Sequence, residues 1–395
     1  MQDFIYLDYQ ATTPTSKEAL SEMLPFFNEV YGNPSVRYHE QGVESGKAVE
    51  IARRKVARLI GAKARELIFT SGATESNFIA LLGLARTFPK RRHIITTAIE
   101  HRSVLANVEL LKTLGYSVTV LPVSHEGIIE IDALKDSVQD NTLCVSVMWA
   151  NNEMGSVQPI SEISAFCQER KIPLHVDAAQ SIGKISLNLQ EMPIDLLTLS
   201  SHKMYGPKGV GALFIRSSLL KLFQSPVVGG SQEQGLRAGT LNVPGIVGFG
   251  KAAEQAHEFL QDEPLRLRQL ARDFYNHLKQ GLHQLGVETS LNGPQCFEKR
   301  LPGNLNMLLR GVDAETLLMN IQGVACSSGA ACASASREPS YVLRALGLTD
   351  REAKCSIRLS VGRSTTEQEL QLAVGRILDA VKHVVNLGKM ENCYD

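Results

Sequence analysis

Several side chains able to carry out covalent and proton-transfer chemistry stand where strand-like apolar runs give way to polar residues. Lys203 follows the run IDLLTLSSH at 194–202 and precedes a Gly-Pro turn. A lysine amine whose pKa is lowered by its surroundings can form a covalent link with an aldehyde. A single lysine is by default a solvated surface charge, however, and Lys208 stands only five residues further on.

An acid and a histidine hold comparable positions after two other apolar runs. Asp177 ends the run IPLHVD at 172–177, where burial without a partner would be costly. A pyridinium nitrogen is one partner for such a carboxylate, and a helix cap or a salt bridge would serve equally well. His101 follows HIITTAIE at 93–100 and could stack on a planar ligand and move protons, although a lone histidine is more often a satisfied structural group.

A turn suited to phosphate follows the strand-like run ELIFTSG at 66–72. Thr74 lies in SGATES, where a strand ends, a glycine-containing turn follows and a helix begins. Backbone N–H groups and the positive end of the helix dipole favour an anion at such a point. A plain helix N-cap by Ser71 or Thr74 explains the same residues, so the turn alone leaves both interpretations open.

A cysteine lies in the compositionally biased segment SSGAACASAS at 327–336. A thiol on a loop of small residues can act as a thiolate nucleophile that moves between a buried substrate and the surface. The alternative interpretation of Cys332 is a flexible linker with an incidental cysteine. Taken in order along the chain, the phosphate turn, the histidine, the aspartate and the lysine form the layout expected of a pyridoxal-phosphate (PLP) site on a parallel sheet.

The elements that must position these residues alternate between short apolar runs and longer helical patterns. Strand-like runs rich in Val, Ile, Leu and Thr occur at 66–72, 93–101, 116–123, 142–150, 172–179 and 194–202. Such alternation predicts β-α-β units and a mostly parallel sheet covered by helices on both faces. Helical sequence runs from about 245 to 286, with a break at Pro264, and the pattern then changes to that of a smaller α+β domain.

Composition excludes several classes of protein. The 395 residues carry 41 Lys plus Arg and 41 Asp plus Glu, so no basic excess favours nucleic acid or a membrane surface. The first residues lack the pattern of a signal peptide, and no apolar run is long enough to span a membrane. The seven cysteines include no C-x-x-C pair, which indicates a reducing compartment. No group of Cys and His residues has the spacing of metal ligands.

The sequence resembles the cysteine desulfurases of the NifS/IscS type, in the class V aminotransferase group of fold-type I PLP enzymes. The resemblance rests on blocks in the same order over nearly the whole chain: YLDYQATTP (6–14), YGNPS (31–35), FTSGATESN (69–77), EHRSVL (100–105), NNEMG (151–155), HVDAAQ (175–180), SSHKMYGPKGVGAL (200–213), GGSQEQGLRAGT (229–240), SSGAACASASREPSYVLRALG (327–347) and SIRLSVGR (356–363).

The resemblance implies an α/β fold of PLP fold type I with two domains. The large PLP-binding domain would span 15–258 and contain a mostly parallel seven-stranded sheet flanked by helices. The smaller α+β domain would combine 1–14 with 259–395 and carry the mobile loop of the catalytic cysteine, at about 324–338.

The resemblance also implies roles for individual residues. Lys203 would carry PLP and shuttle protons, with His101 stacking on the ring and assisting proton transfer. Asp177 would pair with the pyridine nitrogen and Gln180 with the ring oxygen. The remaining cofactor contacts would come from Ala73, Thr74, Asn152, Ser200 and His202, with Thr240 reaching the phosphate of a neighbouring subunit in a homodimer. The substrate would be held by Asn33, Asn152 and Arg358, the last on its carboxylate.

The activity so implied is conversion of L-cysteine to L-alanine with transfer of sulfur to Cys332 as a persulfide. From there sulfur would pass to an acceptor protein for iron–sulfur cluster assembly, thio-cofactors or tRNA thiolation in the cytoplasm. No metal is expected, although Cys332 could contact a cluster during transfer.

Other functions remain as alternatives to be weighed. A selenocysteine lyase shares the fold and these residues. An aminotransferase would not need Cys332, and a degenerate scaffold or sulfur carrier would not need to keep Lys203, Asp177 and His101. A nucleotide-binding function would rest on the segment GIVGFGK at 245–251. Its glycine spacing is the reverse of the dinucleotide-binding motif and no strand-like run precedes it, so this function is rejected.

Two features of this sequence differ from the pattern of the NifS/IscS-type cysteine desulfurases. Cys326 stands six residues before Cys332, where a buried strand residue is the favoured interpretation over a sulfur relay. The chain given ends at LGKMENCYD, whereas the housekeeping members of this group carry a longer tail that docks an iron–sulfur scaffold protein, and this difference argues against that partner here. Cys393 in this tail is interpreted as an exposed bystander.

Overall fold

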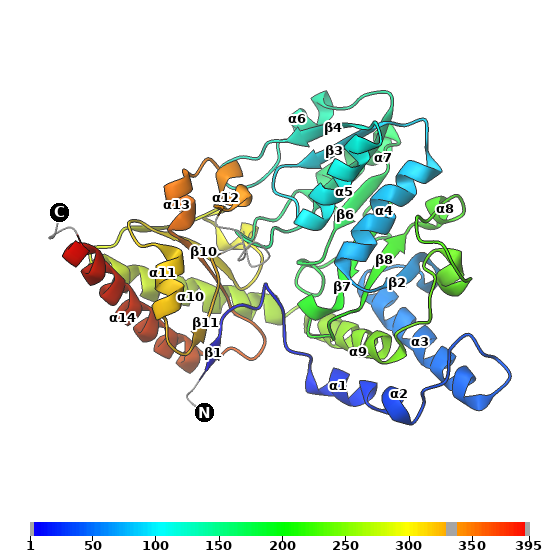
Figure 1. Cartoon of the computed structure of the whole chain (residues 1–395), viewed down its shortest axis with the longest axis horizontal. Coiled ribbons are helices and arrows are strands. Elements are labelled where there is room, and N and C mark those ends of the chain that lie inside the picture. The colour runs from blue at the N-terminus through cyan, green and yellow to red at the C-terminus, as the bar shows by residue number, and fades with distance from the viewer. Residues whose placement is uncertain (1–3, 329–337, 392–395) are drawn as a thin grey trace.

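The protein is built around two sheets that lie side by side and belong to separate lobes (Figure 1). The structure, a computed structural model, describes residues 4–328 and 338–391. The larger lobe contains a seven-stranded sheet of order β2-β8-β7-β6-β5-β3-β4. Its strands are β2 (Leu67–Thr70), β3 (His93–Thr97), β4 (Ser117–Leu121), β5 (Thr142–Met148), β6 (Leu174–Asp177), β7 (Leu196–Ser200) and β8 (Gly211–Ile215).

This sheet is mostly parallel, as the alternation of elements predicted. Strands β3 to β7 pair in parallel, and β8 alone runs against both of its neighbours. Strand β8, the run GALFI, was not among the strands predicted from the sequence. Because β8 returns antiparallel between β2 and β7, it brings the turn after β2 beside the end of β7.

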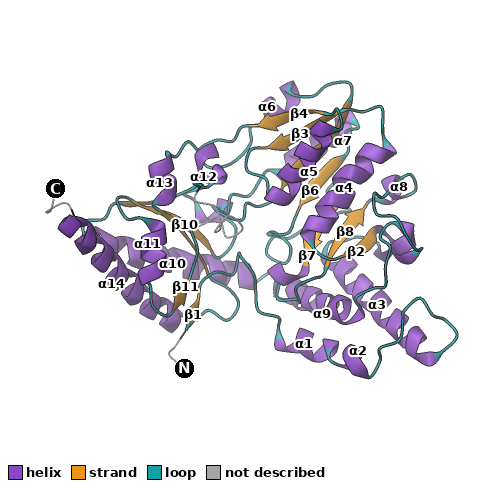
Figure 2. Cartoon of the chain, in the orientation of Figure 1, coloured by secondary structure: helices purple, strands orange, loops and turns teal. Residues whose placement is uncertain are grey.

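Helices cover both faces of the large sheet, because alternate residues of each strand point to opposite sides. Leu67 and Phe69 of β2 join one apolar core, whereas Ile68 joins another. The first core is closed by α3 (Glu40–Leu59), α6 (Ile131–Asp136), α7 (Ile160–Arg170) and α9 (Val243–Phe259). The second is closed by α4 (Ala73–Thr87), α5 (Arg102–Thr113) and α8 (Ser217–Leu220). Helices α1 (Lys17–Met23) and α2 (Pro25–Asn28) lie beside α9 (Figure 2).

The smaller lobe has its own apolar core. An antiparallel sheet of order β12-β10-β9 packs against the amphipathic helices α10 and α14. The elements are β9 (Thr289–Leu291), β10 (Asn304–Leu309), β12 (Ser356–Ser360), α10 (Glu263–Gln284), α11 (Ala314–Asn320) and α14 (Glu367–Glu391). Helices α9 and α10 are separate, and Pro264 stands in the first turn of α10, where a proline is tolerated.

The N-terminal segment connects the two lobes. Strand β1 (Ile5–Tyr6) pairs in parallel with β11 (Val324–Ala325), and Leu7 is buried in the smaller core. Further along, Thr13 donates a hydrogen bond to the carbonyl of His202 in the larger lobe. Residues 8–12 therefore cross between the lobes, directly beside the end of β7.

A second connection is made by α12 (Tyr341–Ala345) and α13 (Asp350–Lys354). Val342 and Leu343 pack on Ile99 and Met148 of the larger lobe in a small separate apolar cluster. Short 3-10 turns complete the fold at Ala64–Glu66, Ser201–Lys203, Gln232–Gly235 and Phe297–Lys299.

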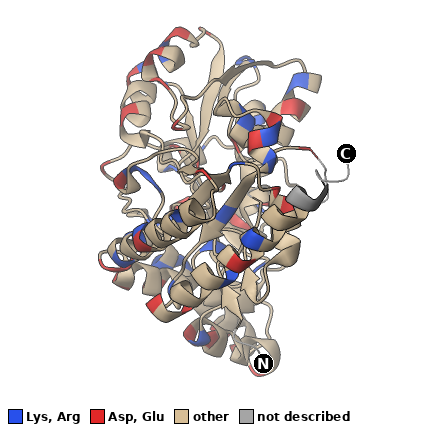
Figure 3. Ribbon diagram, turned by 90° about the vertical axis from the view of Figure 1, so that its left-hand side faces the viewer, with Lys and Arg blue, Asp and Glu red and all other residues tan. Residues whose placement is uncertain are grey.

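Charged residues of both signs are interspersed along the helices at the end of the molecule drawn in Figure 3. Within the part of the chain that the structure describes, no helix has both the length and the apolar character needed to cross a bilayer. Within those same residues, no group of three or more His, Cys, Asp or Glu side chains is placed to hold a metal ion.

Candidate active site

A large cavity opens between the lobes, at the carboxyl ends of the parallel strands. Its volume is about 620 Å³, enough for a cofactor and a small substrate. Ten of the residues singled out from the sequence line this one cavity: Ala73, Thr74, His101, Asn152, Asp177, Gln180, Ser200, His202, Lys203 and Arg358.

Lys203 lies on the 3-10 turn that directly follows β7, so its amine projects over the end of the sheet. The amine Nζ donates to the carbonyl oxygens of Gln10 and Ala11, at 2.6 and 2.9 Å. These two carbonyls belong to the N-terminal segment that crosses between the lobes. Lys203 is therefore held in place by neutral acceptors, whereas Lys208 is exposed at the edge of the same cavity.

Asp177 and His101 are joined by a chain of hydrogen bonds that the sequence did not reveal. Asn77 Nδ2 donates to Asp177 Oδ2 and also to Ser103 Oγ, both at 2.8 Å. Ser103 Oγ in turn lies 2.8 Å from His101 Nδ1. The other oxygen of Asp177 accepts from the backbone amide of Ala179 at 3.0 Å. The carboxylate at the end of β6 and the imidazole after β3 therefore have linked orientations.

The backbone of α5 determines which nitrogen of His101 carries the hydrogen. His101 is the N-cap of this helix, and its Nδ1 accepts a hydrogen bond from the Ser103 amide at 3.1 Å. Because a backbone amide can only donate, Nδ1 must be the acceptor and the neutral ring carries its hydrogen on Nε2. His101 thus serves as a helix cap, the structural alternative, and lines the cavity as well.

One end of the cavity has the features of an anion site. Helix α4 begins at Ala73 with no side-chain cap at Gly72, whose φ of 149° lies in a region that favours glycine. The amides of this first turn and the positive end of the helix dipole are presented to the cavity beside Thr74. Ser200, at the end of β7, lies on the same wall.

His202 is a neutral component of that wall. Its Nδ1 lies 3.0 Å from the hydroxyl of Thr12. Burial, together with the smaller effect of the positive charges of Lys203, Lys208 and Lys184, lowers the pKa of His202 to about 4. The ring is therefore uncharged at neutral pH, and it can contact an anion only through a hydrogen bond.

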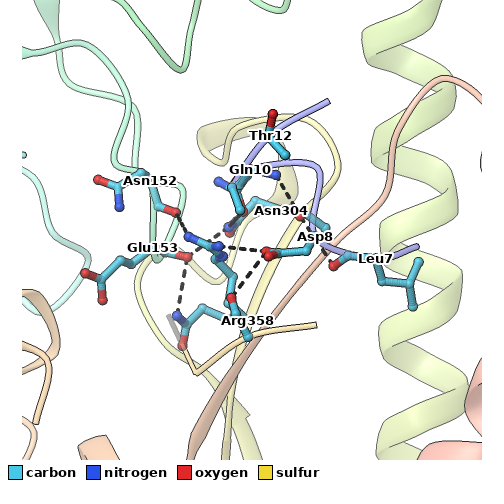
Figure 4. A network of polar contacts seen from close by, with 12 residues as sticks. Leu7, Asp8, Gln10, Thr12, Asn152, Glu153, Asn304 and Arg358 are labelled. Atoms are coloured by element: carbon cyan, nitrogen blue, oxygen red, sulfur yellow. Dashed lines mark hydrogen bonds and ion pairs between the residues drawn. The ribbon is translucent and has the colours of Figure 1, made fainter. Parts of the chain in front are cut away.

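Arg358 lies on the opposite, small-domain side of the cavity, on β12 (Figure 4). Its guanidinium is 1% exposed, and its Nη2 forms an ion pair with Asp8 Oδ1 at 2.7 Å. Its Nη1 donates to the carbonyl oxygen of Asn152 at 2.8 Å. A guanidinium held by two neighbours in this way is a rigid donor for a carboxylate ligand.

Other cavity residues were missed by the sequence analysis. Glu153 is almost fully buried, and its Oε2 accepts from Ser340 Oγ at 2.6 Å. Burial raises the pKa of Glu153, although the bond from Ser340 and the charge of Arg358 oppose this shift. Tyr341 also lines the cavity, with the guanidinium of Arg102 4.7 Å from its ring centre.

Some predicted site residues lie elsewhere or outside the described residues. Asn33 and Thr240 are both exposed and do not line this cavity. Cys332 and Cys393 lie outside the residues that the structure describes. Cys326 is partly buried after β11, and burial raises the pKa of its thiol to about 12, which disfavours the thiolate needed for sulfur relay.

Comparisons with known proteins agree with this geometry. Residues 5–372 match the family described as Aminotransferase class-V. The cysteine desulfurase IscS of Rickettsia felis is 44% identical over 387 residues, which cover 98% of this chain and 93% of that protein. The probable mitochondrial cysteine desulfurase of Schizosaccharomyces pombe is also 44% identical over 387 residues, covering 98% of this chain and 76% of that one.

Solved structures that are similar to this chain agree with these sequence matches. A NifS-like protein superimposes with a TM-score of 0.86 at 36% identity, covering 95% of this chain and 98% of that one. A structure described as SspA in complex with cysteine has a TM-score of 0.78 at 34% identity, covering 90% and 98%. The chain belongs to the class-V aminotransferase family, whose members are PLP-dependent enzymes. Within that family it is a cysteine desulfurase, which confirms the activity and the fold predicted from its sequence.

Proposed function

We propose that the cavity binds PLP on Lys203 and desulfurates L-cysteine held by Arg358. The observation that carries this proposal is the carboxylate of Asp177. It is 5% exposed, and among the described residues it forms no ion pair. A buried carboxylate without a counter-ion is costly, and the protonated nitrogen of a pyridine ring would supply the missing charge.

A second buried atom supports the fit. Gln180 donates through Nε2 to the carbonyl of Gln10 at 3.0 Å, but its Oε1 has no hydrogen-bond partner among the described residues. An unsatisfied buried oxygen in a cavity wall is rare and favours a polar ligand at that wall. The anion site at the start of α4 suits the phosphate, so the residues present match the three polar ends of the cofactor.

When bound, PLP draws electrons away from the α-carbon of an attached amino acid. The residues of this chain then act on the substrate. Arg358 binds its carboxylate, and Asn152 and Glu153 line the same side of the cavity. The amine of Lys203 removes the proton from the α-carbon and later returns a proton to the product, while His101 presents its Nε2 hydrogen to the reaction.

The sulfur step is assigned to Cys332, as the resemblance implies. The thiolate of Cys332 attacks the sulfur of the substrate, so that a sulfur–sulfur bond forms while the bond from carbon to sulfur breaks. The electron pair of the broken bond stays on carbon, which takes up a proton and leaves as L-alanine. The enzyme retains a persulfide, whose outer sulfur passes to an acceptor with a thiol group.

We also propose that the active enzyme is a homodimer. Asn33 and Thr240 would complete the cavity of a second copy, since both are exposed and neither lines the cavity of its own chain. Tyr31 and Tyr38, on either side of Asn33, are 70% and 89% exposed and would be covered by such an interface. Mixing an inactive Lys203→Ala variant with an inactive Thr240 variant should restore activity in the mixed dimer, because one of its two sites combines the intact Lys203 of one chain with the intact Thr240 of the other.

The function is tested by incubating the PLP-loaded protein with L-cysteine. Equal amounts of L-alanine and of bound persulfide are expected in the first turnover, with the persulfide on the peptide containing Cys332. Alanine formation that persists in Lys203→Ala would contradict the assignment of the lysine. Parallel turnover of L-selenocysteine by Cys332→Ala and wild type distinguishes a lyase, which would lose little activity, from a desulfurase.

A further inference from the structure

We propose that Asp8 weakens the hold of Arg358 on amino-acid carboxylates, so that the product L-alanine can leave. This inference rests on the proposed function, in which Arg358 binds the substrate carboxylate. In the sequence, Asp8 lies in the block YLDYQATTP at 6–14, and no role was predicted for it.

Asp8 is fixed in position by backbone contacts from both sides. It forms a bridge with Ser360 of β12, and the amide of Ser360 donates to the carbonyl of Leu7 at 2.7 Å. The hydroxyl of Tyr6 donates to the carbonyl of Asp8 at 3.1 Å. These contacts hold the backbone of Asp8 beside β12, the strand that carries Arg358.

The carboxylate of Asp8 is shared between two donors. Its Oδ1 accepts from Arg358 Nη2 at 2.7 Å and from the hydroxyl of Ser327 at 3.2 Å. Ser327 and Arg358 are themselves paired through their backbones, with the Arg358 amide 2.6 Å from the Ser327 carbonyl. Figure 4 shows Asp8 and Asn152 reaching the guanidinium from different directions.

The charge of Asp8 opposes the binding of a second carboxylate. A substrate carboxylate on the same guanidinium would lie within roughly 7 Å of Asp8, because both anions contact one planar group. Two like charges at this separation in a poorly hydrated site repel each other appreciably. L-cysteine and L-alanine carry the same carboxylate, so this repulsion weakens the binding of substrate and product alike.

Removing the charge should tighten binding because the orientation of Arg358 does not depend on Asp8 alone. The carbonyl of Asn152 still holds Nη1, and the buried side chain still lies on a paired strand. Asparagine at position 8 keeps an acceptor for Nη2 without the negative charge. A purely structural role for Asp8 predicts the opposite result, namely weaker binding of every ligand.

The experiment measures the affinity of the PLP-loaded protein for isotopically labelled ligands by equilibrium dialysis. Asp8→Asn is expected to bind L-alanine about tenfold more tightly than wild type, equivalent to about 1.4 kcal/mol. Ethylamine, which is alanine without the carboxylate, should bind both proteins equally. Asp350→Asn is the matched control, because it removes one negative charge from an exposed pair with Arg344, and neither of these residues lines the cavity.

Folding is checked by circular dichroism and by PLP content, and Asp8→Ser replaces Asp8→Asn if the latter does not fold. An unchanged or weaker affinity for L-alanine overturns the proposal, as does an equal tightening of ethylamine. Arg358→Gln separates this failure from failure of the proposed function. If Arg358→Gln leaves alanine binding unchanged, the carboxylate site itself is wrongly assigned. If it weakens alanine binding and Asp8→Asn does not tighten it, only the role of Asp8 is wrong.

Discussion

The lowered pKa of a buried histidine beside the site predicts how the stability of the enzyme depends on pH. His175 lies on β6, two residues before Asp177, and is fully buried. Its Nδ1 lies 2.8 Å from Ser146 Oγ, and its Nε2 lies 3.1 Å from Thr198 Oγ1. Burial lowers the pKa of His175 to about 4, although the charge of Asp177 acts in the opposite direction.

The size of the effect follows from the difference between the folded and unfolded pKa. Between pH 6.5 and 4 the unfolded chain binds a proton at this residue that the folded protein does not. The free energy of unfolding therefore falls with decreasing pH in this window, by about 1.4 kcal/mol per pH unit from this group. The contribution of His175 between pH 6.5 and 5 is about 2 kcal/mol.

The assay is equilibrium unfolding in urea at pH 7.5 and pH 5, for wild type, His175→Asn and His257→Asn. His257 is an exposed histidine on α9 and serves as the matched control. Burial also lowers the pKa values of His93 and His202, so every variant loses stability in acid. The loss should be about 2 kcal/mol smaller in His175→Asn than in the other two proteins. Equal losses in all three would refute the argument.

Three further predictions concern binding, chemistry and stability. Arg358→Gln should weaken L-cysteine binding by about 2–4 kcal/mol without affecting ethylamine, because a charged contact to the carboxylate is lost; equal weakening of both ligands in a binding titration would count against it. Cys332→Ser should still bind PLP and L-cysteine but form no persulfide, and a persulfide found elsewhere by mass spectrometry would exclude the assignment. Glu233→Gln should lower the free energy of unfolding by about 3 kcal/mol, since it removes the buried carboxylate that pairs with Arg53 and leaves that guanidinium only its pair with the exposed Glu50. In the same urea titration, Glu44→Gln, in an exposed pair with Lys47, should change stability by less than about 1 kcal/mol.

The sequence predicted the catalytic side of the site because that side obeys a local rule. Asp177 ends a strand of one parallel sheet, Lys203 and His101 each follow another, and the carboxyl ends of parallel strands meet at one edge. Thr74 belongs to the same edge only because β8 returns antiparallel beside β2. That return was missed, since GALFI is short and overlaps the block already assigned to the lysine.

The other side of the cavity depends on pairings between distant residues. Asp8 meets Arg358 across 350 positions, and Glu153 meets Ser340 across 187. No local spacing or periodicity reports such contacts, because the turns and helices between them determine the register. The resemblance still named Arg358, but it could not indicate which residues hold its guanidinium or which charge lies beside it.

The most direct test of the account is to find which amine carries the cofactor. Borohydride reduction of the PLP-loaded protein, followed by peptide mapping, should place the pyridoxyl label on Lys203. Lys184 is the strongest competitor, because burial lowers the pKa of its amine to about 8 and it lines a small cavity together with Lys203. A label on Lys184 or Lys208, or no label at position 203, would contradict the proposed site.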